Sequence, residues 1–475
     1  MVAAGWLRVR YFTALGLEAV RFGHFLFLRE KYKMSGEKII KSFAKYVSQS
    51  MIAAVGLSLY IIVDTFFVSL GLGTNGLAAL NLAIVIYSVV FAAGQLLGIG
   101  GGTRYTILRA QGRGKEAETV FAQSLTLGLA LGIVLTLAGL FLSPSIARLL
   151  GAGDATFEMT REYLQCVLFF APVFIINSIL VAFVRNDGNP RLAMGAMLCG
   201  TAVNIVLDYI FIFPLGMGMF GAAFASCLSP VTSIGVLSIH FIKTGRRLRF
   251  LRPGGRAALA ICAPGLSVFV TEIAAGVVLF VFNHLILGIE GVTGVAAYGV
   301  IANLAIVVTA LYNGIAQGIQ PILSKFYGEG QSRGIALVLR YALVLSGIVF
   351  VVVYGILCVM PDTLVALFNS EREETLAQMA RTGLFLYFSG FLFSGFNIVA
   401  AAYFSAVGQS SRGFAISLIR GGIALVPFAY LLSSMLGMHG VWLSFPAAEV
   451  VALLVAVAFF QKNYKGRRKE DYPET

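Results

Sequence analysis

Long apolar runs follow one another along almost the whole of this chain. Hydrophobic residues make up 58% of its 475 positions and charged residues only 12%. A soluble domain cannot bury that much apolar surface, whereas a run of about 20 apolar residues crosses a bilayer as one helix. The sequence therefore predicts an all-α polytopic membrane protein. We place twelve transmembrane helices at residues 48–71, 77–103, 118–143, 161–184, 192–214, 219–242, 257–288, 293–320, 334–360, 378–404, 413–435 and 438–461.

The basic residues are distributed unevenly between the two sides of these runs. Most of the 35 Lys and Arg residues lie in the two tails and in the loops between even and odd runs. Cytoplasmic segments are enriched in basic residues, so we expect both termini in the cytoplasm of a multi-pass plasma (inner) membrane protein. The opposite side carries only Arg148, Arg161, Arg372 and Arg381, and we place Arg340 and Arg420 near the ends of runs.

The same distribution explains the net charge of +13. Contact with the anionic lipids of the bilayer is enough to account for it, so we expect no nucleic-acid partner. Separately, we expect the protein to be a monomer. The histidines and cysteines show no metal-ligand spacing, and we expect no cofactor.

The polar stretches divide the chain into five parts. We expect a cytoplasmic N-terminal segment at 1–45, in which 1–33 is disordered or an extension ahead of a natural start at Met34. A short amphipathic helix is expected after Met34. Two six-helix lobes follow at 46–242 and 257–461, joined by a basic cytoplasmic connector at 243–256, and a cytoplasmic tail occupies 462–475.

The two lobes repeat each other at an offset of roughly 219 residues (our alignment of the sequence with itself). Six helices is an even number, so both halves cross the membrane in the same direction, and a parallel pseudo-twofold axis relates them. Two such lobes facing each other suit a transporter that alternates access between the two sides. The matching segments are 63–83 with 282–302, 105–118 with 321–334, 184–194 with 404–414, and 216–226 with 437–447.

Three carboxylates interrupt the apolar runs: Asp64, Asp208 and Glu272. An acidic side chain at the centre of a transmembrane helix costs about 2.5 to 3.5 kcal/mol, so it usually has a partner, a water-filled cavity or a bound cation. An interhelical hydrogen-bond anchor is the alternative. Asn204 precedes Asp208 by four residues and Tyr60 precedes Asp64 by four, so each pair shares one helix face. If those faces meet, their oxygens suit either Na⁺ or a shared proton.

Further polar residues lie within the runs. Each is either a lining residue of a central cavity that contacts substrate or an interhelical hydrogen bond. The candidate lining residues are Gln95, Asn177, Asn303, Gln317, Gln320 and Asn397.

These motifs resemble the multidrug and toxic compound extrusion (MATE) family of secondary transporters over nearly all of residues 40–460. The resemblance rests on Tyr60-x-x-x-Asp64 with the following Gly-Leu-Ala-Ala, and on Asn204-x-x-x-Asp208 with the following Phe-Pro-Leu-Gly-x-Gly. Gly221-Ala-Ala-x-Ala-Ser226 and the Pro264 to Glu272 spacing add to it.

The resemblance implies cation-coupled antiport, driven by H⁺ or Na⁺, of amphipathic and usually cationic organic compounds. It also implies a coupling site at Asp64, Asn204 and Asp208, with Tyr60 beside it and Ser226 where some members carry Thr. Glu272 matches an acidic position that one branch uses in the second lobe, but we find no counterpart to that branch's later acidic residue. Asp64 aligns with Asn283 and Asp208 with Pro427, so the coupling carboxylates are not duplicated.

Two other functions remain as alternatives. A lipid-linked oligosaccharide flippase of the same broader superfamily should carry several Arg or Lys in its cavity to bind phosphates, and such residues are nearly absent from the centres of the runs. A membrane-embedded enzyme should show a catalytic motif such as His-Glu-x-x-His or Gly-x-Ser-x-Gly with its partners, and we find neither. We therefore expect a transporter that is not an enzyme.

Overall fold

The computed structural model describes residues 36–246, 248–366 and 373–471, and these residues are almost entirely helical, with no β-strand among them. The expectations for residues 1–33 and for Arg372 lie outside the described residues. The first lobe contains α2 (Gly36–Ala110), α3 (Gly114–Leu149), α4 (Asp154–Phe169), α5 (Ala171–Asn186), α6 (Pro190–Ile212) and α7 (Gly218–Thr244). The second contains α8 (Gly255–Cys262), η1 (Ala263–Gly265), α9 (Leu266–Gly328), α10 (Ser332–Val359), α11 (Pro361–Ala366), α12 (Glu374–Phe388), α13 (Phe391–Ala406), α14 (Ser410–Leu418), η2 (Ile419–Ile423), α15 (Leu425–Leu436) and α16 (Met438–Asp471).

The predicted fold class, twelve spans in two lobes, is confirmed. Eight helical segments of the described chain are long and apolar enough to cross a membrane, and two bent pairs, α4 with α5 and α12 with α13, add one span each. The two longest segments each contain a break, at Gly73 in α2 and at Gly291 in α9, and so provide two spans apiece. At these breaks the backbone has positive φ, which glycine tolerates best.

Two predicted spans are bent rather than straight. The span predicted at 161–184 consists of α4 and α5, which meet at an angle of 51°, and the span predicted at 378–404 consists of α12 and α13, which meet at 43°. Pro172 at the start of α5 accounts for the first bend, because proline lacks a backbone N–H and begins helices more readily than it continues them.

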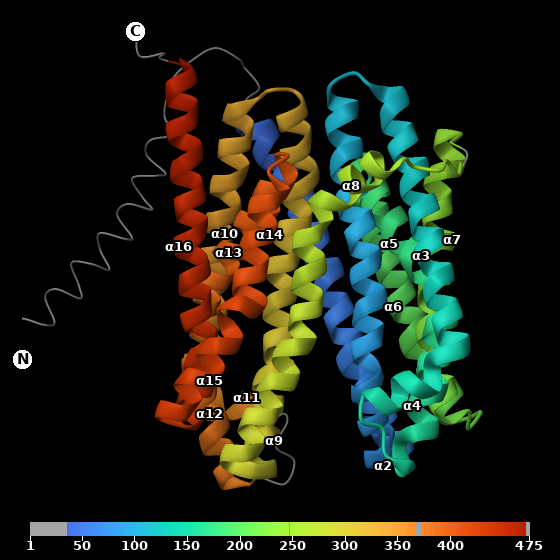
Figure 1. The fold of residues 1–475 in the computed structure, drawn as a ribbon, viewed down its shortest axis with the longest axis vertical. Helices are drawn as coiled ribbons and strands as arrows, with labels where there is room; N and C mark the ends of the chain where they lie inside the picture. The colour runs from blue at the N-terminus through green and yellow to red at the C-terminus, as the bar shows by residue number, and fades with distance from the viewer. Residues whose placement is uncertain (1–35, 247, 367–372, 472–475) are drawn as a thin grey trace, which may run out of the picture.

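The backbone repeats itself in the two lobes. Figure 1 shows the first lobe on the right and the second on the left, with the connector running between them. Gly73 and Gly112 correspond to Gly291 and Gly330, which lie 218 positions later, whereas Gly188 corresponds to Gly408, which lies 220 positions later. These offsets refine the alignment made from sequence, because Asp64 now corresponds to Phe282 and Asp208 to Phe428. Neither carboxylate is duplicated in the second lobe.

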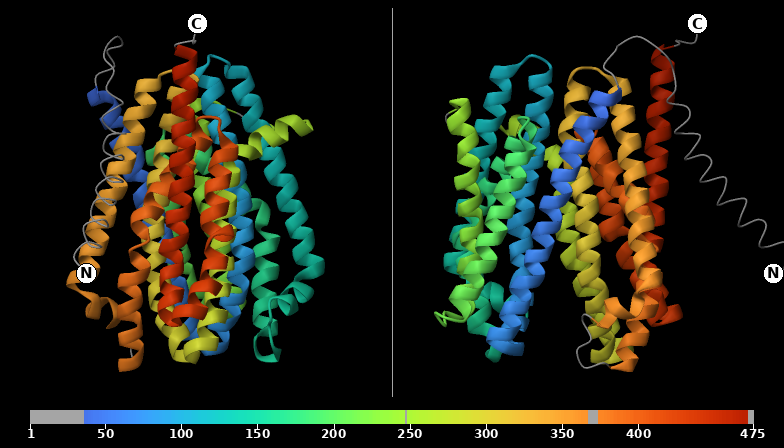
Figure 2. Two further views of the ribbon diagram at one scale, coloured as in Figure 1. Left: turned by 60° about the vertical axis from the view of Figure 1, so that its left-hand side comes forward. Right: turned by 180° about the vertical axis from the view of Figure 1, so that it is seen from behind.

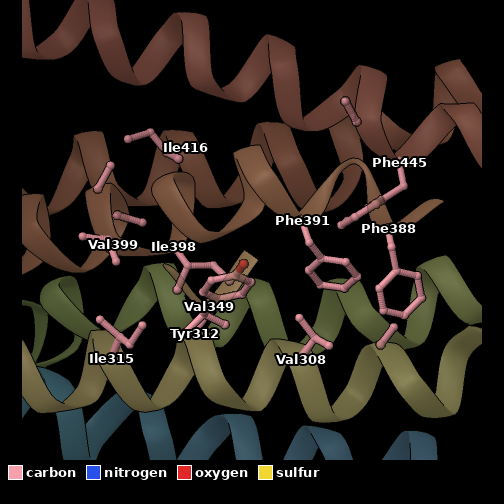
Figure 3. Close-up of a cluster of buried hydrophobic side chains, with 14 of the residues drawn as sticks. Val308, Tyr312, Ile315, Val349, Phe388, Phe391, Ile398, Val399, Ile416 and Phe445 are labelled. Atoms are coloured by element: carbon pink, nitrogen blue, oxygen red, sulfur yellow. The ribbon is translucent and has the colours of Figure 1, made fainter. Parts of the chain in front are cut away.

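The core of the second lobe contains a group of packed aromatic side chains. Figure 3 shows Tyr312, Phe388, Phe391 and Phe445 packed between helices that are distant in sequence. Phe391 and Phe445 have ring centroids 5.2 Å apart, so the start of α13 is held against α16. Edge and offset contacts of this kind add to the stabilisation that burial of the rings already provides.

The lobes contact each other mainly in the half of the bundle where α2 begins and α16 ends. There α9 packs closely against α2, because a Cβ atom on Gly318 would lie 2.6 Å from Val47 Cα and one on Gly314 would lie 2.5 Å from Met51 Cα. Gln320 Nε2 also donates to Thr103 Oγ1 at 2.8 Å. The ribbons of α2 and α9 diverge toward the opposite end (Figure 2).

The first turns of α2 belong to the core of the second lobe. Ile39, Phe43 and Val47 are buried in its apolar cluster, and the rings of Phe43 and Tyr341 meet at 5.7 Å. Helix α2 therefore begins within the described part of the N-terminal segment predicted at 1–45 and links one lobe to the other.

Candidate functional site

Asp64 and Asp208 meet inside the first lobe. Asp64 lies on α2 and Asp208 on α6, and both side chains are buried. The two carboxyl groups lie within hydrogen-bonding reach of each other. One oxygen of each, Oδ1, is also buried without a hydrogen-bond partner. Two carboxyl groups can stay this close in a dry interior only if they share a proton or hold a cation between them.

Asn204 completes this pair on the α6 side. With its amide nitrogen facing the carboxyl group, it donates to Asp208 Oδ2 at 3.1 Å and accepts from the backbone N–H of Ser226 at 3.2 Å. In the opposite orientation its nitrogen lies 3.3 Å from Ser226 Oγ. Asn204 is fully buried, so one of these two arrangements must satisfy its amide.

Tyr60 lies on the same helix as Asp64, one turn earlier. Its hydroxyl lies 3.0 Å from the hydroxyl of Tyr87, which follows the break at Gly73. Sequence reasoning did not identify Tyr87, nor the buried Tyr163 of α4, which also lies within electrostatic range of Asp64. Phenols among so many aromatic residues gave no distinguishing signal.

The structure thus brings together Tyr60, Asp64, Asn204, Asp208 and Ser226, which the sequence selects from three different helices. They offer two carboxyl groups, an amide, a phenol and an aliphatic hydroxyl within one buried region. Hard oxygen ligands of this kind suit a monovalent cation such as Na⁺, and the paired carboxyl groups equally suit a proton. Among the residues that the structure describes, no group of three or more His, Cys, Asp or Glu side chains could hold a metal ion.

Glu272 lies on α9 in the second lobe, partly buried and without a hydrogen bond or ion pair to any described residue. Its charge lies within electrostatic range of Tyr87 in the first lobe. Tyr87 in turn hydrogen-bonds to Tyr60, which lies one turn from Asp64 on α2.

Most of the candidate lining residues take part in hydrogen bonds. Gln317 accepts from Arg185 Nη1 at 2.7 Å across the lobes, and Gln320 bonds to Thr103 and Asn186 in the first lobe. Asn303 donates to the Gly299 carbonyl one turn earlier. Asn177 has a buried oxygen without a partner, and Gln95 is buried with no bond to the described residues.

Two arginines make polar contacts inside the protein. Arg185, in the last turn of α5, is 4% exposed at the contact between the lobes. Arg420, which we had placed near the end of a run, lies within the span between α14 and α15 and pairs with Glu449 of α16. Glu449 was missed although it is a fourth carboxylate inside an apolar run, at 438–461, which was the available signal.

Comparison with known proteins identifies the family of this fold. A family model described as MatE matches residues 40–210 and 268–431, which is most of the chain and covers a large part of each lobe. The chain belongs to the MATE family. This MATE protein is therefore a multi-pass membrane transporter, as the motifs around Asp64 and Asp208 indicated.

Curated relatives carry an efflux function in their names. The chain is 27% identical to the multidrug export protein MepA of Staphylococcus saprophyticus over 437 residues, 90% of this chain and 94% of the relative. It is 26% identical to MepA of Staphylococcus aureus strain MRSA252 over 432 residues, with the same coverage of both chains.

Solved structures share the fold. One described as the outward-facing conformation of a multidrug resistance MATE family transporter matches with a TM-score of 0.85 at 24% identity, over 92% of this chain and 100% of that one. A transporter of the MOP superfamily from Pyrococcus furiosus matches with a TM-score of 0.84 at 24% identity and the same coverage. At this identity the likeness concerns the fold alone.

Proposed function

We propose that this MATE protein is a cation-coupled antiporter that exports amphipathic, cationic organic compounds by alternating access of its two lobes. The coupling ion, H⁺ or Na⁺, binds at Asp64, Asn204 and Asp208. The observation that carries the proposal is the buried Asp64–Asp208 contact, in which each carboxyl group keeps one oxygen without a partner. Burying two carboxylates without a bound cation costs free energy, and a bound cation stabilises the pair by neutralising its charge.

Helix α2 provides the mechanical link between the site and the lobes. Asp64 lies in the first lobe, while Met51, earlier on the same helix, packs against Gly314 of α9 in the second. Cation binding at Asp64 pulls this part of α2 toward α6 and alters how its earlier turns pack on α9. The proposed cytoplasmic location of both termini would put the contact between the lobes on the cytoplasmic side, so we propose that the site loads from outside.

Glu272 supports this substrate class. Glu272 has no described partner and lies within electrostatic range of Tyr87. An organic cation bound next to Glu272 would therefore interact with its carboxylate and with the aromatic ring of Tyr87. The multidrug export function in the names of the MepA relatives supports this class of substrate.

The test is export by purified protein in proteoliposomes, with an imposed pH gradient or an imposed Na⁺ gradient. We expect Asp64→Asn and Asp208→Asn to abolish gradient-driven export of a fluorescent organic cation. Asp154→Asn, which changes an exposed carboxylate at the start of α4, is the matched control and should leave export unchanged.

Two results would reject the proposal. Undiminished export by both Asp variants would remove the coupling role of the site. Loss of gradient dependence in Glu272→Gln alone, with both Asp variants active, would move coupling to the second lobe. The gradient that drives export in the unmodified protein identifies the ion.

A further inference from the structure

The second lobe carries a charged pair where the first lobe carries two small residues. Helices α13, α14 and α16 each begin 220 positions after their first-lobe counterparts: Phe391 after Ala171, Ser410 after Pro190, and Met438 after Gly218. By this relation Arg420 corresponds to Gly200 and Glu449 to Ser229. The first-lobe positions also touch, because a Cβ on Gly200 would lie 2.9 Å from Ser229 Oγ.

Both carboxylate oxygens of Glu449 accept hydrogen bonds from neighbouring side chains. Arg420 Nε donates to Glu449 Oε1 at 3.1 Å and Nη2 donates to the same oxygen at 2.6 Å. Asn397 Nδ2 donates to Oε2 at 2.7 Å, and its helix, α13, also supplies Ser394 Oγ, which accepts from Arg420 Nη2 at 2.6 Å. The Glu449 side chain is 1% exposed, so it has no surface left for a ligand.

The Arg420 guanidinium has one nitrogen without a hydrogen-bond partner among the described residues. No described residue accepts a hydrogen bond from Arg420 Nη1, and the Arg420 side chain stays 10% exposed. Arg420 lies in the middle of a span, where an N–H group directed at lipid tails would be left without a partner at high cost. That cost is avoided only where the exposed edge of the guanidinium meets water inside the protein.

The local backbone presents this edge. Arg420 lies in the π-helical turn η2, whereas α6, the corresponding first-lobe helix, is α-helical throughout. A π-turn inserts one extra residue and rotates the side chains that follow, and such turns are frequent at functional sites. The next residue, Gly421, packs against Ala274 of α9, the helix that also carries Glu272 and contacts the first lobe.

We propose that Arg420 is a substrate-binding residue that recognises a carboxylate or similar anionic group on the exported compound. This inference rests on the proposed export function and assigns the residue that binds the anionic group when an exported compound is zwitterionic. Glu449 holds the guanidinium in place and balances its charge, and the Nη1 edge binds the anionic group. A zwitterion fits better than a simple anion. Arg420 is already neutralised by Glu449, so the carboxylate of a bound compound adds a negative charge, and the cationic group of the same compound balances it in this low-dielectric environment.

The experiment compares two dyes with one scaffold, rhodamine 6G, which is a cationic ester, and rhodamine 19, which is its zwitterionic free acid. Binding of each to purified protein in nanodiscs is followed by fluorescence anisotropy near neutral pH. The double variant Arg420→Gln/Glu449→Gln keeps hydrogen-bonding side chains without burying a lone charge. It should weaken binding of the acid by about tenfold or more, the value of a charge-assisted hydrogen bond, while binding of the ester stays within about twofold.

A second variant separates recognition from packing. Glu449→Gln removes the competing negative charge, so it should strengthen binding of the acid relative to the ester. A purely structural pair would lower binding of both dyes in both variants, and that result would overturn the inference. An unchanged ratio of acid to ester affinity in the double variant would overturn it too. Arg340→Gln, at an exposed position of α10, is the control.

The outcomes distinguish this inference from the proposal on which it rests. Failure of the unmodified protein to bind or export the ester would reject the cationic substrate class. An ester that is exported normally, with an acid whose binding ignores Arg420, would reject the arginine site alone.

Discussion

Gly73 and Gly291 turn the two longest helices of the chain with almost the same backbone angles. Gly73 has φ 68° and ψ −162°, and Gly291 has φ 63° and ψ −152°. Each joins two spans, so the pair marks the first hairpin of each lobe. A side chain other than glycine is disfavoured in this region of backbone conformation. The backbone conformations of Gly73 and Gly291 therefore repeat between the two lobes.

Gly73→Ala should lower the stability of the protein by about 1–3 kcal/mol, because alanine is disfavoured at this φ even though the space around Gly73 is open. Thermal unfolding of the detergent-purified protein measures the change. Gly276→Ala is the control, since Gly276 lies inside α9 with open space around it. Equal unfolding temperatures for the two variants would contradict the prediction.

Gly318→Ala should separate the lobes where they now touch. The new methyl group would lie 2.6 Å from Val47 Cα, which is backbone and cannot turn aside as a side chain can. We expect a larger distance between spin labels placed on α2 and α9 in this half of the bundle. Gly299→Ala, on the same helix but in open space, should leave that distance unchanged. Identical distances in both variants would show that the lobes tolerate the extra methyl group.

Gln317→Glu should hold the lobes together. Arg185 Nη1 now donates to a neutral amide, and its Nε is buried without a partner. A carboxylate at position 317 would form a charge-assisted bond that is about twice as strong as the present one. We expect slower export together with a higher unfolding temperature. Gln317→Ala should have the opposite effect on stability, because it leaves the buried guanidinium unpaired. Faster export by Gln317→Glu would rule out a holding role for this contact.

Asn204→Ala and Ser226→Ala should differ in effect. If the Asn204 amide donates to Asp208 and accepts from the backbone N–H of Ser226, the serine hydroxyl is dispensable and only Asn204→Ala impairs coupling. The ion-concentration dependence of export measures coupling in both variants. Equal impairment in the two variants would instead favour the orientation in which Asn204 bonds to Ser226 Oγ.

Much of the candidate site could be read from the sequence because charge in an apolar run is a strong signal. Asp64 and Asp208 stood out for their cost, and the four-residue spacing of Asn204 and Asp208 placed both on one helix face. The contact between Asp64 and Asp208 could not be predicted, because the spacing of residues within one helix does not show which face of a second helix packs against it.

The contact between Arg420 and Glu449 cannot be predicted from the sequence. Each lies in a different apolar run, and neither has a charged neighbour at helical spacing. Only the packing of α13, η2 and α16 brings them together and buries them. The π-turn that presents Arg420 contains the adjacent Gly421 and Gly422, which indicate an irregular backbone but do not specify a π-turn.

The sequence by itself determined the class of protein, the count of spans, the parallel repeat and the family. These follow from hydropathy and residue spacing, which act along the chain. The tertiary structure decided which carboxylates lie together, which arginine pairs with Glu449, and which half of the bundle joins the lobes. Those relationships depend on contacts between helices that are distant in sequence, which side-chain shape and hydrogen bonding select only once the helices pack.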